Sequence, residues 1–253
     1  MKLSIVTVCF NAELDLRNTF ESVRAQDAKD FEYIVIDGGS VDGTKALIAE
    51  YEDIIDYYIS EPDSGIYDAM NKGLRKCSGD FVHMLNAGDI YYDGASVRRI
   101  LSALNEDDCV MLFPCVSGCG AMLRSYKGHF GKLLWESFGC HQGYVVSLKN
   151  TNNCFFNIKY SIKADRDLLL RLYLNGCKFR FVPGSPICTY DTGGVSNRNL
   201  VRKEIENIRI SFSHKGAFKV KTLLFALGKV SVYGVTRAFN MDWKKIKKAL
   251  GGK

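Results

Sequence analysis

The sequence lacks the features that place a chain across a membrane or build it around disulfides. No uncharged apolar run reaches the roughly 18 residues needed to span a bilayer, and the longest uncharged stretch, residues 109–123, is interrupted by Pro114, Gly118 and Gly120. Nine cysteines occur, an odd number, with no C-x-x-C pair, and there is no N-x-S/T sequon. We therefore expect free, mostly buried thiols and a cytoplasmic location.

The usual phosphate-binding signatures are also missing. No G-x-G-x-x-G follows the first apolar segment, and no Walker A sequence is present. Neither the common dinucleotide site nor a phosphate-cradling loop is therefore expected. A phosphorylated ligand would have to be neutralised by a metal ion and a few cationic side chains.

The net charge of +6 is concentrated at one end of the chain. From Arg198 onward there are 14 Lys and Arg against 3 Asp and Glu, whereas residues 1–197 carry a net charge of −5. Residues 198–253 read as a basic amphipathic helical tail, which suits the surface of an anionic bilayer. A helix that packs on the body and exposes its basic face to water fits equally well. Nucleic acid is not an expected partner, because the basic charge does not follow the sheet.

Apolar segments alternate with helical periodicity in the first 108 residues. This alternation predicts an α/β fold with a mostly parallel, Rossmann-like sheet covered by helices. The predicted strands are Leu3–Phe10, Phe31–Asp37, Ile54–Ser60 and Phe81–Leu85. Residues 109–197 are less regular, with predicted strands Cys109–Val116, Met122–Tyr126, Gly143–Ser147, Phe179–Val182 and Ile187–Tyr190, and helices Leu133–Phe138 and Leu168–Leu174.

Polar residues follow the predicted parallel strands where each strand ends. Asp37 closes the second strand, Asp63 follows the third, and Asn86-Ala87-Gly88-Asp89 follows the fourth. The carboxyl ends of parallel strands form the ligand-binding edge of an open sheet, so these groups should converge there. Asn-Ala-Gly-Asp alone is also ordinary turn chemistry. Asp89 at this edge could nevertheless hold a divalent cation that carries phosphates.

Several of these segments together resemble a known family. Residues 4–11 (SIVTVCFN), 35–44 (VIDGGSVDGT) and 85–89 (LNAGD) are similar to the successive signatures of family 2 glycosyltransferases with the GT-A fold, and residues 60–73 (SEPDSGIYDAMNKG) resemble the subgroup that builds bacterial surface polysaccharides. The resemblance covers about residues 1–200. It implies a catalytic domain over 1–197, with a nucleotide-binding half (1–108) and an acceptor half (109–197), followed by the basic extension 198–253.

The resemblance also implies roles around the nucleotide. Thr7 and Asn11 would lie beside the nucleoside, and Asp37 would hydrogen-bond the base, most often uracil. The pocket would be bordered by Asp63 and by the helix that carries Lys72, with Lys72 near the phosphates. Gly193-Gly194 resembles a loop that closes over the donor, and Arg198, just after it, is expected to help neutralise the diphosphate.

The resemblance implies that two further segments take part in metal binding and in proton transfer. Asn86 and Asp89 occupy the position of the family's metal-binding D-x-D, but Asp89 is the only carboxylate left, so Mn²⁺ or Mg²⁺ would take its other ligands from the diphosphate and water. Asp165 resembles the catalytic base, and Asp167 is the competing candidate. Capping of the following helix is the structural alternative for Asp165. His141-Gln142 could line the acceptor pocket or form an ordinary polar pair at a strand start.

These expectations together predict an inverting glycosyltransferase. It would transfer a sugar from a nucleotide-sugar, with UDP as the favoured nucleotide, to a glycan or lipid-linked glycan acceptor, in the cytoplasm or on the inner face of the plasma membrane. One alternative is a catalytically degenerate nucleotide- or sugar-binding module, which the reduced metal motif favours. A sugar-phosphate nucleotidyltransferase is less consistent with the sequence, because no glycine-rich loop follows the first strand.

Overall fold

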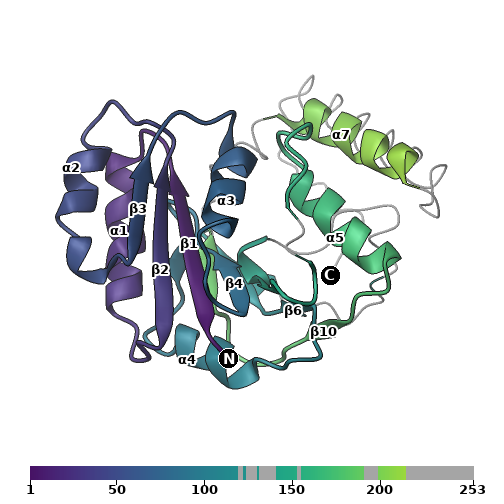
Figure 1. Ribbon diagram of the computed structural model, residues 1–253, viewed down its shortest axis with the longest axis horizontal. Helices are drawn as coiled ribbons and strands as arrows, with labels where there is room; N and C mark the ends of the chain where they lie inside the picture. Colours follow the sequence, from purple (N-terminus) through teal and green to yellow (C-terminus); the bar gives the residue numbers. More distant parts are fainter. Residues whose placement is uncertain (119–121, 124–129, 131–140, 153–154, 191–198, 215–253) are drawn as a thin grey trace, which may run out of the picture.

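The core of the protein is a seven-stranded sheet. The computed structural model describes residues 1–118, 122–123, 130, 141–152, 155–190 and 199–214. The strand order is β10-β6-β9-β4-β1-β2-β3 (Figure 1). Every neighbouring pair is parallel except those of β9, which runs antiparallel to both β4 and β6. The strands are β1 (Leu3–Cys9), β2 (Phe31–Asp37), β3 (Tyr57–Ser60), β4 (Phe81–Met84), β6 (Val110–Leu112), β9 (Tyr144–Ser147) and β10 (Phe179–Phe181).

Helices cover both faces of this sheet, as the alternation of elements predicts. In β1, Leu3 and Ile5 belong to one apolar cluster, whereas Val6 and Val8 belong to another on the opposite face. This division follows from the two-residue period of a strand. Helices α1 (Glu13–Arg24), α2 (Thr44–Ala49) and α4 (Ser96–Ala103) pack on the first face, and α3 (Ile66–Leu74) and α5 (Ala164–Leu174) on the second. The predicted α/β architecture is confirmed.

A second, smaller sheet corrects one predicted strand. Its order is β5-β11-β7-β8, formed by β5 (Ile90–Tyr91), β11 (Cys188–Tyr190), β7 (Cys115–Ser117) and β8 (Met122–Leu123). The segment Cys109–Val116, predicted as one strand, is divided between β6 and β7, which lie in different sheets. Pro114 separates them, because proline has no N–H to donate to a ladder. A second predicted strand, Ile54–Ser60, is shortened because residues 52–54 form a 3₁₀ turn, η1 (Glu52–Ile54).

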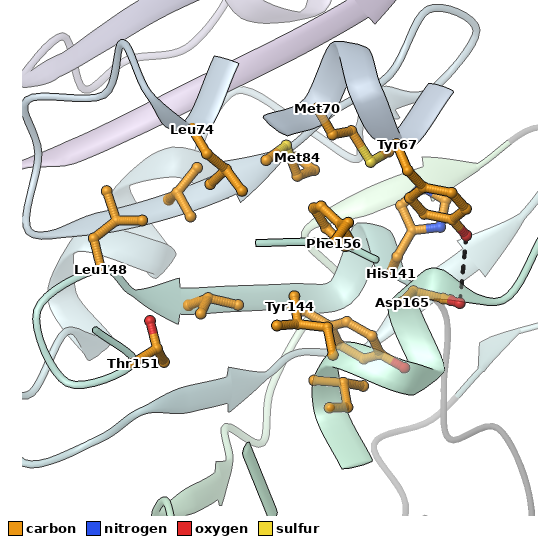
Figure 2. A pocket seen from close by; sticks show the side chains of 14 residues that line it. Tyr67, Met70, Leu74, Met84, His141, Tyr144, Leu148, Thr151, Phe156 and Asp165 are labelled. Atoms are coloured by element: carbon orange, nitrogen blue, oxygen red, sulfur yellow. Dashed lines mark hydrogen bonds between the residues drawn. The ribbon is translucent and has the colours of Figure 1, made fainter. Parts of the chain in front are cut away.

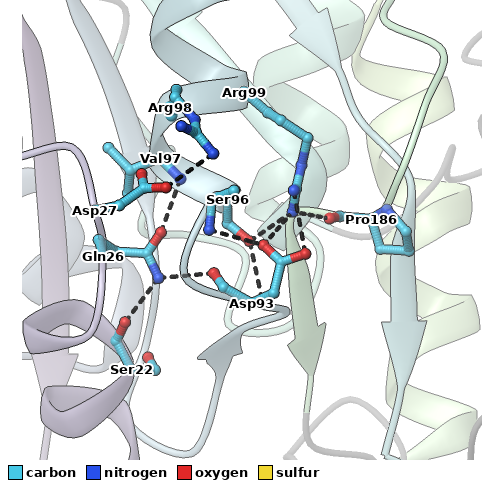
Figure 3. Close-up of polar contacts among 10 residues, drawn as sticks. Ser22, Gln26, Asp27, Asp93, Ser96, Val97, Arg98, Arg99 and Pro186 are labelled. Atoms are coloured by element: carbon cyan, nitrogen blue, oxygen red, sulfur yellow. Dashed lines mark hydrogen bonds and ion pairs between the residues drawn. The ribbon is translucent and has the colours of Figure 1, made fainter.

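A partly buried polar network connects the segment after α1 with the segments next to β5 and β11, at the end of α1 that lies farthest from the carboxyl end of β1. The Gln26 amide donates to the carbonyl oxygens of Ser22 and Asp93, at 2.9 Å each, and accepts the Val97 N–H at 2.9 Å (Figure 3). Arg99 pairs with Asp93 and donates to the Pro186 carbonyl, which precedes β11. These contacts hold α1, α4 and the segment before β11 together at the end of the sheet opposite the carboxyl end of β1.

The first helix of the basic extension, α7 (Leu200–Ser213), packs against α5. The Arg166 side chain of α5 is almost completely buried and donates to Asn207 O at 2.9 Å and to Ser211 Oγ at 2.7 Å. The predicted domain boundary at residue 197 stays a prediction. Residues 215–253, the predicted helix Leu133–Phe138 and the Gly193-Gly194 loop lie outside the described residues. Within the described part of the chain, no helix is both long and apolar enough to cross a membrane.

Candidate active site

Asp37 closes β2 with a carboxylate that is fully buried. It accepts the Ser40 N–H at 3.0 Å, the Ser60 hydroxyl at 2.5 Å, and the Ser40 hydroxyl. The neighbouring Cys9 thiol lies 3.9 Å from this carboxylate. Burial, followed by the charge of Asp37, raises the pKa of Cys9 well above its ordinary value, so the thiol stays protonated. Asp37 thus organises the turn after β2. Its hydrogen bond to the base of the nucleotide stays a prediction.

Asn11 links the loops that follow β1 and β2. Its backbone has φ 46°, a left-handed conformation that asparagine tolerates better than most residues. The Asn11 N–H donates to Ser40 Oγ at 2.8 Å, and its side-chain oxygen accepts the Val41 N–H at 2.9 Å. Asn11 therefore shapes the rim of the predicted nucleotide site.

The placement of Thr7 differs from the prediction that it lies beside the nucleoside. Its side chain is completely buried within the sheet. The Thr7 hydroxyl donates to Leu85 O at 2.7 Å and lies 2.9 Å from the Tyr33 hydroxyl. Because both groups lie inside the protein, Thr7 supports the floor of the site and offers no surface to a ligand in this structure.

Phe10 is a site residue to which the sequence analysis assigned no role. Its side chain is 62% exposed at the carboxyl end of β1. A Cβ atom on Gly38 would lie 2.3 Å from Asp63 Oδ2 and 3.3 Å from the Phe10 ring. Glycine at this position therefore lets Asp63 and Phe10 approach the end of β2 closely. The available signal was an aromatic residue immediately after a buried strand at the ligand-binding edge.

The Lys72 side chain is bonded to the loop that precedes its own helix, α3. Its ammonium donates to Pro62 O at 2.7 Å and pairs with Glu61 at 2.8 Å. Asp63 in the same loop accepts the Gly65 N–H at 2.7 Å. Lys72 thus holds the loop that borders the Asp63 side of the site, and its predicted contact with phosphates stays a prediction. Arg198 lies outside the described residues.

The turn after β4 presents Asn86 and Asp89 at the same edge of the sheet. Gly88 has φ 90°, a conformation that favours glycine. Asp89 is 4% exposed and accepts the Gln142 side-chain N–H at 2.9 Å. The Asn86 amide nitrogen donates to His141 Nε2 at 2.8 Å, whereas its buried Oδ1 has no hydrogen-bond partner among the described residues.

His141 and Gln142 begin a 3₁₀ turn, η3 (His141–Gly143), that reaches the Asn86-Asp89 turn. The Gln142 carbonyl accepts a hydrogen bond from His83 Nε2 at 2.8 Å. Burial, followed in effect by the neighbouring His141, lowers the pKa of His83 to about 4, so His83 is a neutral structural residue at pH 7. The backbone of η3 is therefore anchored in the core, while its two polar side chains point to the turn after β4.

The oxygen atoms of this turn are suited to a hard divalent cation. Within the described part of the chain, no group of three His, Cys, Asp or Glu side chains comes together as a complete metal site. The donors present are the Asp89 carboxylate and the orphaned Asn86 Oδ1. Mg²⁺ and Mn²⁺ accept oxygen ligands and commonly keep positions for substrate phosphates and water. The residues therefore fit a cation that is bound jointly with a diphosphate.

Asp165 and Asp167 occupy different environments. Asp165, in the first turn of α5, lines a cavity of about 40 Å³ between α3, β4, β9 and α5, as does His141 (Figure 2). Asp167 is 1% exposed and is paired with Arg171 and His214, each at 2.9 Å. Asp165 does not act as the N-cap, because Lys163 holds that position and no side chain makes a cap bond there. Of the two, only Asp165 faces open space.

The geometry agrees with the comparison to known families. The model of Glycosyl transferase family 2 matches residues 4–168, more than half of the chain. The chain belongs to glycosyl transferase family 2. A PGL/p-HBAD biosynthesis glycosyltransferase of Mycobacterium bovis is 28% identical over 213 residues, which cover 79% of this chain and 81% of that protein. An uncharacterized glycosyltransferase of Mycobacterium tuberculosis is 40% identical over 104 residues, and this match spans only about two fifths of either protein, 41% and 40%.

Solved structures confirm the GT-A fold of this family 2 glycosyltransferase. S. aureus TarS in complex with UDP-GlcNAc superimposes with a TM-score of 0.69 at 16% identity, covering 88% of this chain and 69% of TarS. The mannosyltransferase PcManGT from Pyrobaculum calidifontis, in complex with GDP-Man and Mn²⁺, gives a TM-score of 0.68 at 14% identity, covering 99% of this chain and 79% of PcManGT. At such identities the likeness concerns the fold.

Proposed function

We propose that this glycosyltransferase inverts the anomeric centre of a UDP-sugar as it transfers the sugar to an acceptor hydroxyl. The observation that carries the proposal is the position of His141. It hydrogen-bonds Asn86 in the turn suited to a cation, and it lines the cavity that Asp165 faces. The group that would hold the leaving diphosphate and the group that would accept the acceptor's proton are therefore bridged by one short turn.

The donor would lie along the carboxyl edge of β1 and β2. Phe10 offers an exposed ring for stacking against the base, and Asp63 and the turn organised by Asp37 provide polar groups beside it. TarS has been solved with UDP and with UDP-GlcNAc, and PcManGT with GDP-Man. Because two of these three ligands contain uridine, a UDP-sugar is the first donor to test.

Asp89 and Asn86 would hold Mn²⁺ or Mg²⁺ through their side-chain oxygens. The bound cation supplies positive charge that stabilises the leaving diphosphate. Gln142 orients Asp89, and His141 orients the Asn86 amide, whose Oδ1 has no hydrogen-bond partner among the described residues. Second-shell hydrogen bonds of this kind commonly fix the direction of metal ligands.

Asp165 would act as the general base. As the acceptor oxygen bonds to the anomeric carbon, the bond from that carbon to the diphosphate breaks, and the acceptor's proton passes to the Asp165 carboxylate. Attack opposite the leaving group inverts the configuration. Asp167 is a poor candidate for this role, because its buried carboxylate is held by Arg171 and His214, each at 2.9 Å.

The acceptor is proposed to be a glycan or lipid-linked glycan of a bacterial surface polysaccharide, reached from the cytoplasm or the inner face of the plasma membrane. The mycobacterial relative is named as a PGL/p-HBAD biosynthesis glycosyltransferase, which supports a biosynthetic role for this chain. The basic composition of residues 198–253 supports contact with an anionic surface.

A thermal-shift series with UDP, GDP, dTDP and CMP, each with and without Mn²⁺, tests the donor site. A ligand at one hundred times its dissociation constant adds about 2.7 kcal/mol of stability. We expect the largest shift with UDP plus Mn²⁺ and its loss in Asp89→Ala. Asp27→Asn, a surface variant at the opposite end of α1 (Figure 3), serves as the control and should keep the shift.

Turnover distinguishes the enzyme from a degenerate binding module, for which the single carboxylate of the metal turn is the best argument. We expect release of UDP from UDP-N-acetylglucosamine or another UDP-sugar, with Asp165→Asn keeping the UDP shift but losing most turnover. A UDP shift without turnover on any UDP-sugar would support the binding module. The absence of any nucleotide shift would contradict the proposed donor site.

A further inference from the structure

The irregular segment before α5 is held to α3 by two side chains one helical turn apart. The Asn71 amide donates to Phe156 O at 2.9 Å and accepts the Phe156 N–H at 2.8 Å, so it pairs both backbone groups of that residue. The Tyr67 hydroxyl donates to Ile162 O at 2.9 Å. Residues i and i+4 of a helix lie on the same face. This face of α3 therefore fixes both ends of the segment that leads into Asp165.

The same segment is held from its other side by α7. The Glu206 carboxylate accepts the N–H groups of Ser161 at 3.0 Å, Ile162 at 2.9 Å and Lys163 at 2.9 Å, and it also accepts the Ser161 hydroxyl. A carboxylate at a helix N-terminus satisfies backbone donors that have no partner within the helix. Glu206 thus holds, from α7, the three residues that lead into α5, and it places a negative charge near the N-terminus of that helix.

The Tyr67 hydroxyl also approaches Asp165 itself. It lies 3.4 Å from Asp165 Oδ1, and both side chains line the cavity (Figure 2). The hydroxyl has a single proton, which the Ile162 carbonyl at 2.9 Å and Asp165 Oδ1 at 3.4 Å share. Burial, followed by the charge of Asp165, raises the pKa of Tyr67 well above its ordinary value, so Tyr67 remains a donor at all working pH values.

The remaining described hydrogen bond of Asp165 goes to the same oxygen. Oδ1 accepts the Arg166 N–H at 2.8 Å. With Oδ1 held by Tyr67 and by the backbone of α5, Oδ2 is the oxygen that can accept a proton from a group in the cavity. The Tyr67 ring lines this cavity on the α3 side.

We propose that Tyr67 is a positioning residue for the catalytic base Asp165. Its hydroxyl orients the carboxylate by holding Oδ1 and the Ile162 carbonyl together, so that Oδ2 faces the acceptor hydroxyl. The inference rests on the proposed role of Asp165. Tyr67 belongs to residues 60–73, which lie in the nucleotide-binding half. Its proposed function lies in the acceptor half.

The test is Tyr67→Phe, which keeps the ring and removes the hydroxyl. UDP release from UDP-N-acetylglucosamine with Mn²⁺, with water as acceptor, gives kcat and KM; a more active UDP-sugar found in the donor screen replaces it. We expect kcat to fall about tenfold, which corresponds to about 1.4 kcal/mol, with the donor KM and the UDP-induced thermal shift unchanged. Tyr51→Phe removes another buried hydroxyl, which bonds Glu21 far from the cavity, and should leave kcat unchanged at a similar cost in melting temperature.

A double-mutant cycle separates positioning from general loosening of the fold. If Tyr67 acts through Asp165, Tyr67→Phe should lower the residual kcat of Asp165→Asn less than twofold. An equal fold-loss in both backgrounds, or an unchanged kcat in Tyr67→Phe alone, would overturn the inference. A fully active Asp165→Asn variant would instead refute the proposed base, so the two failures are distinguishable.

Discussion

Glu206→Gln is the most informative stability variant, because one side chain holds the segment before the proposed base. The wild-type carboxylate accepts four hydrogen bonds, two at each oxygen. Glutamine has nearly the same size but keeps only one acceptor oxygen. In one orientation this oxygen faces the N–H groups of Ile162 and Lys163, and the amide nitrogen faces the Ser161 N–H. In the reverse orientation the amide nitrogen faces the N–H groups of Ile162 and Lys163.

The expected loss follows from this count. A buried donor without an acceptor costs about 1–3 kcal/mol. One or two such donors, together with the loss of negative charge at the N-terminus of α5, give an expected decrease of about 3 kcal/mol in the free energy of unfolding. For a chain of this size the melting temperature should fall by roughly 6–12 °C.

Urea unfolding followed by circular dichroism measures this loss. Glu50→Gln is the matched control, since Glu50 pairs with Arg17 at 3.0 Å on the surface with both side chains more than half exposed. Such pairs contribute little, so the control should change stability by less than about 0.5 kcal/mol. A loss below about 1 kcal/mol in Glu206→Gln would show that water replaces the carboxylate and that α7 does not hold the segment.

Three further variants test other parts of the structure. His83 takes up its proton near pH 6.5 when unfolded but only near pH 4 when folded, so stability should decrease on the order of 2 kcal/mol from pH 7 to pH 5, and urea unfolding of His83→Gln should show a shallower pH dependence. In Gly73→Ala, the new Cβ would lie 2.4 Å from Val6 Cγ1, and we expect urea unfolding to report a loss of about 2 kcal/mol as α3 moves off β1. Asp167→Asn should cost about 2 kcal/mol by removing a buried charge from its ion pairs but should keep turnover, and a loss of turnover equal to that of Asp165→Asn at unchanged stability would return the role of base to Asp167.

Much of the α/β core was predictable because each strand and helix there has a local signal. The strand Phe31–Asp37 was predicted with its observed bounds, and the buried apolar residues of α1, at positions 16, 20 and 23, follow the helical spacing. The prediction of one strand over Cys109–Val116 was wrong for a physical reason. Its apolar run is continuous, but Pro114 interrupts the backbone ladder and sends the chain into a second sheet. An apolar run predicts that a strand is buried, but it does not predict which other strand it pairs with.

The sequence by itself determined the parallel strands of the first 108 residues and the family, because strand periodicity and ordered motifs are local properties of the chain. Only the tertiary structure decided how the candidate side chains are used. It buried Thr7 within the sheet and paired Asp167 with Arg171 and His214, while it left Asp165 facing a cavity. Apart from the pair Asp167–Arg171, which spans one helical turn, these outcomes depend on contacts between residues 47 to 98 positions apart, such as Tyr67 with Asp165. No local pattern encodes such contacts, because they form only when α3, α5 and α7 pack together.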